Sequence, residues 1–156
     1  MAAPWSCGSE TIYQPYAMNT AAITNKPVPT PDSESAPFWA ACARHELQVQ
    51  RCGACGTHRF PATTYCPKCQ SSSMEWVPST GGGKVFSWVV VHHPVPKEAY
   101  AGDVPYVVAL ITLDEGPRMV SNILSCAPSE VKADMRVQVT FQERDGFSLP
   151  MFKPAA

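Results

Sequence analysis

Strict alternation of apolar and polar residues occurs twice along the chain and predicts a β-strand at each place. Residues 46–51 read Glu-Leu-Gln-Val-Gln-Arg, and residues 135–142 read Met-Arg-Val-Gln-Val-Thr-Phe-Gln. Successive side chains of a strand point to opposite faces, so this pattern is typical of a strand with one buried face. Short apolar runs predict further strands over residues 74–77, 84–93, 106–113, 118–125 and 147–152.

Five of the predicted strands follow Gly81-Gly82-Gly83, which we interpret as a hinge that divides the chain. Residues 126–134 carry few helix signals, so we expect a mainly β C-terminal part that closes as a small barrel. An oligonucleotide/oligosaccharide-binding (OB) barrel has this number of strands. Its expected core is Val85, Val89, Val107, Ala109, Ile111, Val120, Val137, Val139 and Phe141.

A long loop over residues 94–105 separates the first two barrel strands and is rich in proline, glycine and polar residues. In an OB barrel, the loop after the first strand borders the usual binding face. We therefore predict that this region contributes residues close to a substrate, namely Lys97, Tyr100, Asp103 and Tyr106.

The first 35 residues contain five prolines and no sustained period, which predicts an extended or disordered arm. If the arm instead orders against a partner, Trp5, Tyr13 and Tyr16 are its candidate anchors. Met18 is a possible alternative start of the chain.

A short helix is predicted after the arm, with Ser33 or Ser35 as its cap and Pro37 in its first turn. Phe38, Trp39 and Cys42 then share one face of the helix. Two alternatives remain open for this face. It packs on its own domain, or Phe38 and Trp39 form an exposed patch that binds a partner.

Four cysteines form two pairs, Cys52-Gly53-Ala54-Cys55 and Cys66-Pro67-Lys68-Cys69. Each C-x2-C turn directs two sulfurs at one point, and two facing turns supply the four thiolates that a structural Zn²⁺ site requires. The predicted cofactor is therefore a structural zinc ion held by Cys52, Cys55, Cys66 and Cys69. Iron is the alternative, because rubredoxin iron sites also use two such turns.

Composition narrows the class of protein. The chain has 156 residues, 45% of them hydrophobic, and a formal net charge of −1. Its basic residues are scattered, so the patch expected of a nucleic-acid binder is missing. No apolar stretch is long enough for a membrane span, and no signal peptide is visible.

Seven cysteines, four of them spaced for a metal, favour the reducing cytoplasm. We expect the other three, Cys7, Cys42 and Cys126, to be small apolar residues without a catalytic role.

No catalytic residue is predicted. His92 and His93 are adjacent, and on a strand they would point to opposite faces, so both cannot serve one site. We expect one at the barrel surface and one near its rim. Asp114 and Glu115 precede Gly116-Pro117 and are expected in a turn. No Ser-His-Asp order, phosphate-binding glycine loop or HExxH motif is present.

Several motifs, taken in order, resemble one known family. They are Pro37-Phe38-Trp39, Cys52-Gly53-Ala54-Cys55-Gly56, Phe60-Pro61, Cys66-Pro67-Lys68-Cys69, Gly82-Gly83-Lys84-Val85-Phe86-Ser87, Pro105-Tyr106-Val107-Val108-Ala109-Leu110, Leu113-Asp114-Glu115-Gly116, Ser121-Asn122 and Leu149-Pro150-Met151-Phe152. The chain resembles the two-domain proteins that join a rubredoxin-like zinc ribbon to an OB fold and are associated with acyl-CoA metabolism. The resemblance covers about residues 36–154.

The resemblance implies an accessory subunit that pairs with a thiolase-superfamily protein and takes part in acyl transfer or carbon–carbon bond chemistry on CoA thioesters. Contact with the acyl-CoA and association with an enoyl-CoA hydratase are further implications. The expected organisation is an arm over residues 1–35, a leading helix and zinc ribbon over 36–80, and an OB-fold barrel over 81–156.

Two other functions are weighed against the accessory subunit. A single-stranded nucleic-acid-binding module needs a basic groove, and Lys84, Arg118, Lys132 and Arg136 are few and interspersed with acidic residues. An electron carrier would need iron in place of zinc.

Overall fold

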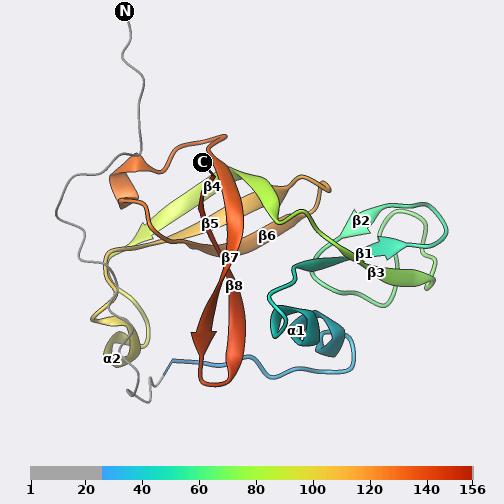
Figure 1. The fold of residues 1–156 in the computed structure, drawn as a ribbon, viewed down its shortest axis with the longest axis horizontal. Coiled ribbons are helices and arrows are strands. Elements are labelled where there is room, and N and C mark those ends of the chain that lie inside the picture. The colour runs from blue at the N-terminus through green and yellow to red at the C-terminus, as the bar shows by residue number, and fades with distance from the viewer. Residues whose placement is uncertain (1–25, 156) are drawn as a thin grey trace, which may run out of the picture.

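The computed structural model describes residues 26–155 as a small three-stranded sheet beside a closed five-stranded barrel (Figure 1). Met18 and the proposed arm anchors Trp5, Tyr13 and Tyr16 lie outside the described residues. The elements are α1 (Ala36–Cys42), β1 (Gln48–Cys52), β2 (His58–Arg59), β3 (Met74–Pro78), β4 (Gly82–Val91), α2 (Lys97–Tyr100), β5 (Tyr106–Leu113), β6 (Arg118–Ile123), a 3-10 turn (Pro128–Glu130), β7 (Arg136–Arg144) and β8 (Phe147–Pro154).

The barrel confirms the mainly β fold expected from the sequence. Its strands follow the order β4-β5-β6-β8-β7, and β7 pairs back with β4 to close it. All neighbouring strands are antiparallel except β6 and β8, which pair in parallel at Ile123 and Phe152. The small sheet has the order β2-β1-β3, so the strand at residues 48–52 lies between the other two.

Most of the predicted barrel core is confirmed. Val85, Val107, Ala109, Ile111 and Val137 are all at most 2% exposed. Val139 and Phe141 are partly buried and pack against that core. The predictions for Val89 and Val120 are wrong, because these side chains are 59% and 63% exposed.

A β-bulge explains the error at Val89. Val85 is opposite Ile111, but Ser87 is opposite the next residue of β5, Leu110, so Phe86 is an extra residue in β4. An extra residue reverses which positions face inward further along the strand. Trp88 and Val90 therefore pack against the core, while Val89 faces outward.

The error at Val120 has a different cause, since β6 carries apolar residues on both faces. Met119 is opposite Ile111 and is 4% exposed, whereas Val120 is opposite Leu110 on the outer face. Two adjacent apolar residues in a strand do not reveal which one is buried.

The leading helix joins the two parts of the molecule. In Figure 1, α1 lies between the small sheet and the hairpin formed by β7 and β8. Phe38 contacts Phe60 and Trp76 of the small-sheet region, with ring centroids 5.3 Å and 6.4 Å away. Trp39 contacts the Phe147 ring of the barrel in a T-shaped, edge-to-face arrangement, with centroids 6.0 Å apart. These aromatic rings therefore fix the small sheet against the barrel.

The N-cap of α1 is Ser35, one of the two predicted caps, and Asp32 holds the turn before it. The Asp32 carboxylate accepts hydrogen bonds from the Ser35 amide, at 2.8 Å, and from the Ser35 hydroxyl, at 2.6 Å. Ser35 makes no capping bond with its own side chain.

The three consecutive glycines, interpreted from the sequence as a hinge, lie at a close-packed junction. A Cβ atom on Gly81 would lie 2.3 Å from Cγ1 of Val139, and one on Gly83 would lie 2.8 Å from the Thr112 carbonyl oxygen. Glycine is needed here because no larger residue fits between these groups.

The turn after β5 also holds this junction. The Glu115 carboxylate accepts hydrogen bonds from the Thr80 amide at 2.7 Å and from the Ser79 hydroxyl at 2.9 Å. Asp114 forms a bidentate ion pair with Arg136, with N–O distances of 2.6 Å and 2.9 Å. Both acidic residues lie at the turn where the sequence predicted them, and both have structural roles.

No helix within residues 26–155 is long and apolar enough to cross a membrane.

Candidate metal centre

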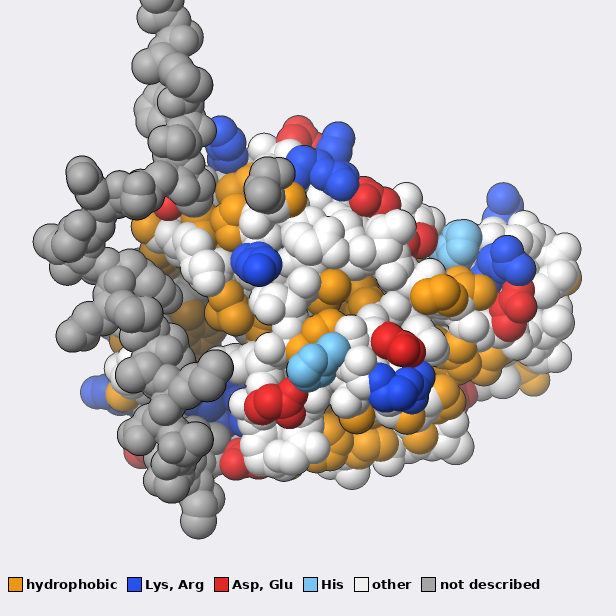
Figure 2. All heavy atoms as spheres, in the orientation of Figure 1, with side chains coloured by type: hydrophobic (Ala, Val, Ile, Leu, Met, Phe, Trp, Pro, Cys, Tyr) orange, Lys and Arg blue, Asp and Glu red, His pale blue; other side chains and the backbone are white. Residues whose placement is uncertain are grey.

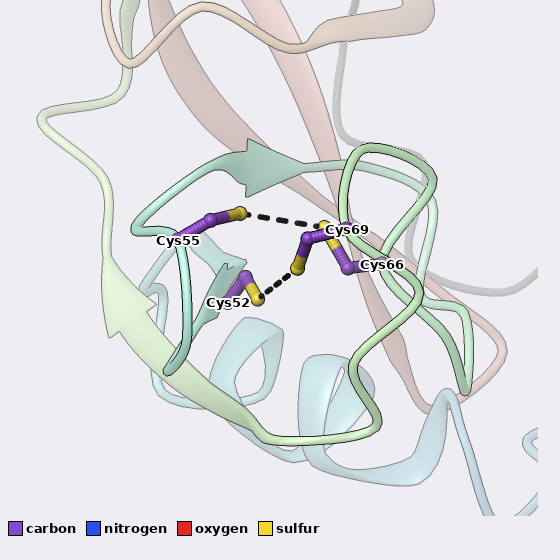
Figure 3. A group of neighbouring side chains, drawn as sticks. All are labelled: Cys52, Cys55, Cys66 and Cys69. Carbon is purple, nitrogen blue, oxygen red and sulfur yellow. Dashed lines mark hydrogen bonds between the residues drawn. The ribbon is translucent and has the colours of Figure 1, made fainter.

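The four predicted metal ligands converge on one point (Figure 3). Cys52 is the last residue of β1 and Cys55 lies in the turn that follows, while Cys66 and Cys69 come from a second turn between β2 and β3. Their sulfur atoms all lie within 4.8 Å of one another. Cys52 Sγ is 3.6 Å from Cys69 Sγ, and Cys55 Sγ is 3.7 Å from Cys66 Sγ.

These separations suit a tetrahedral zinc ion. Zinc–sulfur bonds of about 2.3 Å place the sulfurs of a regular tetrahedron about 3.8 Å apart. Four thiolates complete the coordination shell and leave no position for a substrate or water. The geometry therefore fits a structural metal centre.

The two turns share the same backbone geometry. The amide of Gly56 donates to the Cys52 carbonyl at 2.8 Å, and the amide of Gln70 donates to the Cys66 carbonyl at 2.8 Å. The amide of each first cysteine donates to the carbonyl five residues later, Thr57 at 3.0 Å and Ser71 at 2.9 Å. The repeated bonds show that the two C-x2-C segments fold in the same way and face each other.

The pKa values of three of the four thiols are shifted, and not all in the same direction. The hydroxyl and amide of Thr57 lower the pKa of Cys55 to about 6. The amides of Cys69 and Lys68 lower the pKa of Cys66. The Ser71 amide also favours the Cys69 thiolate, but the neighbouring thiols and burial outweigh it and raise the pKa of Cys69 to about 12. Metal binding therefore has to displace protons from the cluster.

The other predicted site residues lie elsewhere. Phe38 is 5% exposed and packs inside its own chain, which supports the first of the two alternatives for the helix face. Trp39 is only partly buried. Cys42 is buried next to Phe38, and its burial raises the pKa of the thiol to about 12, as expected for a structural cysteine. Cys126 is buried as well, while Cys7 lies outside the described residues.

Residues of the 94–105 loop come together at the end of the barrel. Tyr100 of α2 packs on Tyr106 of β5, with ring centroids 6.0 Å apart. Lys26 pairs with Asp103 and lies 5.4 Å from the Tyr100 ring centroid. The contacts of Lys26 were not predictable from the sequence, because no local pattern links it to Asp103, 77 residues further along the chain.

The expectation for His92 and His93 is wrong in one respect. Strand β4 ends at Val91, so both histidines lie in a bend and not on a strand. Both are exposed, and both line one cavity at the barrel end.

Basic residues do not gather into a groove on the visible face. Figure 2 shows basic and acidic side chains interspersed over that face. Arg136 is paired with Asp114, and the guanidinium of Arg118 stacks on the Phe86 ring at 3.6 Å. These two of the four candidate basic residues are thus engaged within the chain.

Two family models match successive parts of the chain. One, described as "ChsH2, rubredoxin-like zinc ribbon domain", matches residues 39–75, and the other, "ChsH2, C-terminal OB-fold domain", matches residues 76–142. The first match and the sulfur cluster together identify the bound metal as zinc, as predicted. The second confirms the predicted OB-fold barrel.

Two related proteins are named as enzyme subunits. The "Probable enoyl-CoA hydratase alpha subunit" of Thermomonospora curvata is 39% identical over 83% of this chain and 40% of its own length. This chain thus spans about two fifths of that relative. "Benzoylsuccinyl-CoA thiolase subunit BbsA" of Thauera aromatica is 30% identical over 69% of this chain and 74% of its own length.

A solved structure gives the same fold. One chain of the structure "Ltp2-ChsH2(DUF35) aldolase" superposes with a TM-score of 0.75 and is 37% identical. The match covers 83% of this chain and the whole of that chain.

Proposed function

This chain belongs to the ChsH2 (DUF35) family, which joins a rubredoxin-like zinc ribbon to an OB-fold domain, and from that membership we propose that it is a non-catalytic accessory subunit of an acyl-CoA-processing enzyme. Its partner in this proposal is a thiolase-superfamily protein that transfers acyl groups, or makes or breaks carbon–carbon bonds, on CoA thioesters.

The observation that carries the proposal is the match that covers the whole of one chain of the structure named as an aldolase. The thiolase subunit BbsA, matched over 74% of its length, supports the same kind of partner. The match to a hydratase alpha subunit supports a second association, with an enoyl-CoA hydratase.

The chemistry of the site supports a subunit without its own catalysis. The zinc ion is closed by four thiolates, so it cannot activate a water or polarise a substrate. One cluster, formed by His45, Glu143 and Ser148, contains the residue types of a hydrolase. However, the Ser148 hydroxyl donates to Glu143 at 2.6 Å, and His45 Nε2 contacts the same carboxylate oxygen at 2.9 Å. The imidazole is therefore not bonded to the serine whose proton it would have to take.

In this proposal the zinc ribbon and α1 bind the partner, and the barrel lies beside the substrate channel. Trp39 is the partly exposed aromatic residue of α1, and Tyr65 of the ribbon is 62% exposed next to the ligand Cys66. Large aromatic side chains with free surface are typical interface anchors. The 94–105 loop, with Lys97, Tyr100 and Asp103, would then face the acyl-CoA together with Tyr106 of β5 and help to guide it.

Co-expression tests the proposal directly. The full chain and the thiolase-superfamily protein encoded beside it should co-purify and give a defined hetero-oligomer by native mass spectrometry. The enzyme should turn over its CoA thioester in the complex, and this chain alone should not. A chain that stays monomeric in this mixture but binds single-stranded DNA with strong salt dependence would instead support the nucleic-acid function.

A further inference from the structure

A cavity of about 210 Å³ lies at the end of the barrel where β4 gives way to the 94–105 loop. Its lining is His92, His93, Pro94, Lys97, Ala101 and Val104. The polar side chains in this lining are two imidazoles and one ammonium group, and no carboxylate is among them. A cavity of this composition offers nitrogen donors to a ligand and no competing anion.

The loop that forms the cavity is fixed by residues distant in sequence. The Lys26 side chain is 9% exposed and pairs with Asp103, whose side chain is 20% exposed. The same ammonium group lies against the face of Tyr100, and Tyr100 packs on Tyr106 of β5. Figure 1 shows the segment after residue 26 running from the α2 region beneath the β7–β8 hairpin to α1. These contacts fix Tyr100 and Asp103, which follow Lys97 closely in the chain, and so hold the turn that carries Lys97 beside the two histidines.

The charges around the cavity favour an anion. Asp103 is paired with Lys26 and does not line the cavity, and the other nearby carboxylate, Glu98, does not line it either. Lys97 therefore supplies a positive charge within the lining, and each imidazole adds another when it is protonated. A cavity that holds several water molecules also has room for a tetrahedral anion.

We propose that this cavity is a binding site for a phosphate group, held by Lys97, His92 and His93. The ammonium donates to the phosphate oxygens, and each imidazole donates through one ring nitrogen. The phosphate is either free inorganic phosphate or a phosphate of a larger ligand. That the larger ligand is coenzyme A rests on the function proposed above.

Histidine side-chain NMR tests the site in the full chain with its zinc bound. The chain has four histidines, so His45 and His58, which do not line the cavity, serve as internal controls. On titration with inorganic phosphate at constant ionic strength, the signals of His92 and His93 should move saturably and those of the controls should stay in place. Equal movement of all four signals, or no saturation, would overturn the proposal.

Matched substitutions test the donors. Lys97→Gln should weaken phosphate binding about tenfold, since a hydrogen bond to a charged group is worth on the order of one tenfold change in affinity. Lys132→Gln removes an exposed lysine outside the cavity and should leave the affinity unchanged. Equal affinities of the Lys97→Gln chain and the parent chain would contradict the proposal.

Sulfate binding isolates the contribution of the two imidazoles to anion affinity, because the charge of sulfate is constant near neutral pH. Its affinity should rise as the pH falls, since a protonated imidazole carries a charge that the neutral ring lacks. The other ionisable groups next to the cavity are Lys97, Glu98 and Asp103 with its partner Lys26. Changing both histidines to glutamine should flatten the pH profile, and a profile that keeps its slope would count against a role for them.

Competition identifies the source of the phosphate. Coenzyme A, 3′-dephospho-coenzyme A and pantetheine differ in their phosphate groups, and pantetheine has none. Displacement of inorganic phosphate by coenzyme A but not by pantetheine supports a coenzyme A phosphate as ligand. Phosphate binding without such competition supports the same site with a free anion. Assembly of the Lys97→Gln chain with its enzyme partner is measured separately, so loss of this site and loss of the proposed function can be distinguished.

Discussion

Gly56 and Gln70 occupy equivalent positions in the two zinc-binding turns, and both adopt the left-handed backbone conformation, with φ of +71° and +60°. Each follows the second cysteine of its turn and donates its amide to the carbonyl of the first. Glycine adopts this conformation without strain, whereas a residue with a side chain does not. The two turns of the metal centre therefore share one backbone geometry, but only the first has the favoured glycine at this position.

Exchanging these residues should change stability in opposite directions. Gln70→Gly should stabilise the chain by about 0.5–1 kcal/mol, because relief of the strained backbone exceeds the extra freedom of glycine in the unfolded chain. Gly56→Ala should destabilise it by about 1 kcal/mol. No atom lies within 4 Å of the Cβ that alanine would add at Gly56, so the effect is conformational and not steric. Chemical denaturation of the zinc-loaded proteins measures both changes, and a destabilising Gln70→Gly would refute the equivalence.

Zinc should be required for the ribbon to fold. The part from β1 to β3 has short strands, and four of its side chains are committed to the metal. Binding of structural zinc contributes on the order of 10–16 kcal/mol in such modules. Replacement of Cys52, Cys55, Cys66 or Cys69 by serine should lose the metal and unfold at least the ribbon.

Elemental analysis measures the zinc content, and we expect about one zinc ion per chain. Cys126→Ser is the matched control, because it changes a buried cysteine that is not in the metal cluster and should leave the zinc content unchanged. A red, iron-loaded protein from cells grown with ample zinc would favour the electron-carrier alternative.

Charge placed on the two faces of the barrel should have very different effects. Val137 is fully buried, so Val137→Asp would bury an unpaired carboxylate or force it to take up a proton, and should cost about 4 kcal/mol or more. Val120 is 63% exposed, so Val120→Asp should change stability by about 0.5 kcal/mol or less. Thermal unfolding compares the two, and similar melting temperatures would show that the strand faces are assigned wrongly.

Val137 and Val89 show which features of the fold could be predicted from the sequence: the burial of Val137 was predicted correctly and that of Val89 was not. Regular alternation located β7 and the inward face of Val137, and paired cysteine spacing located the metal centre, because both signals are local. The bulge at Phe86 is set by pairing with β5, so the sequence of β4 alone could not reveal that Val89 faces outward. The contact of Lys26 with Asp103 likewise depends on the tertiary fold. The cysteine ligands were predictable because their spacing is a local signal. The lining of the barrel-end cavity was only partly predictable, because it depends on the tertiary fold.

Acid should loosen the junction between the ribbon and the barrel. Burial alone would raise the pKa of Glu115, but the hydrogen bonds from the Thr80 amide and from the Ser79 and Thr80 hydroxyls outweigh it and lower the pKa. A carboxyl group with a lower pKa in the folded state stabilises the fold above its unfolded pKa. That contribution is lost as the pH falls through the folded pKa.

Glu115→Gln should therefore destabilise the chain by about 1 kcal/mol at neutral pH. The difference from the parent should shrink between about pH 5 and about pH 3, where the parent takes up its own proton. Glu98→Gln is the control, since Glu98 is exposed on α2, and it should leave stability unchanged. Denaturation curves across this pH range provide the measurement. A difference that does not vary with pH would show that the Glu115 charge has no part in the junction.

The proposed partner interface should depend on Trp39 and Tyr65 and not on the outer barrel face. Trp39 also packs on Phe147 within its own chain, so Trp39→Ala is expected to lower both assembly and stability. Tyr65→Ala is the sharper test, because Tyr65 is 62% exposed. An anchor residue of this kind contributes about 2 kcal/mol or more to binding, which corresponds to about a thirtyfold weaker complex with the thiolase-superfamily partner.

Val120→Ser is the matched control, because Val120 is equally exposed but lies on the outer face of β6 in the barrel. It should assemble like the parent chain. Zinc content and melting temperature, measured for every variant, separate a lost contact from a lost fold. If Tyr65→Ala retains its zinc and full affinity while Val120→Ser loses the partner, the docking surface lies on the barrel, and the ribbon only braces the fold.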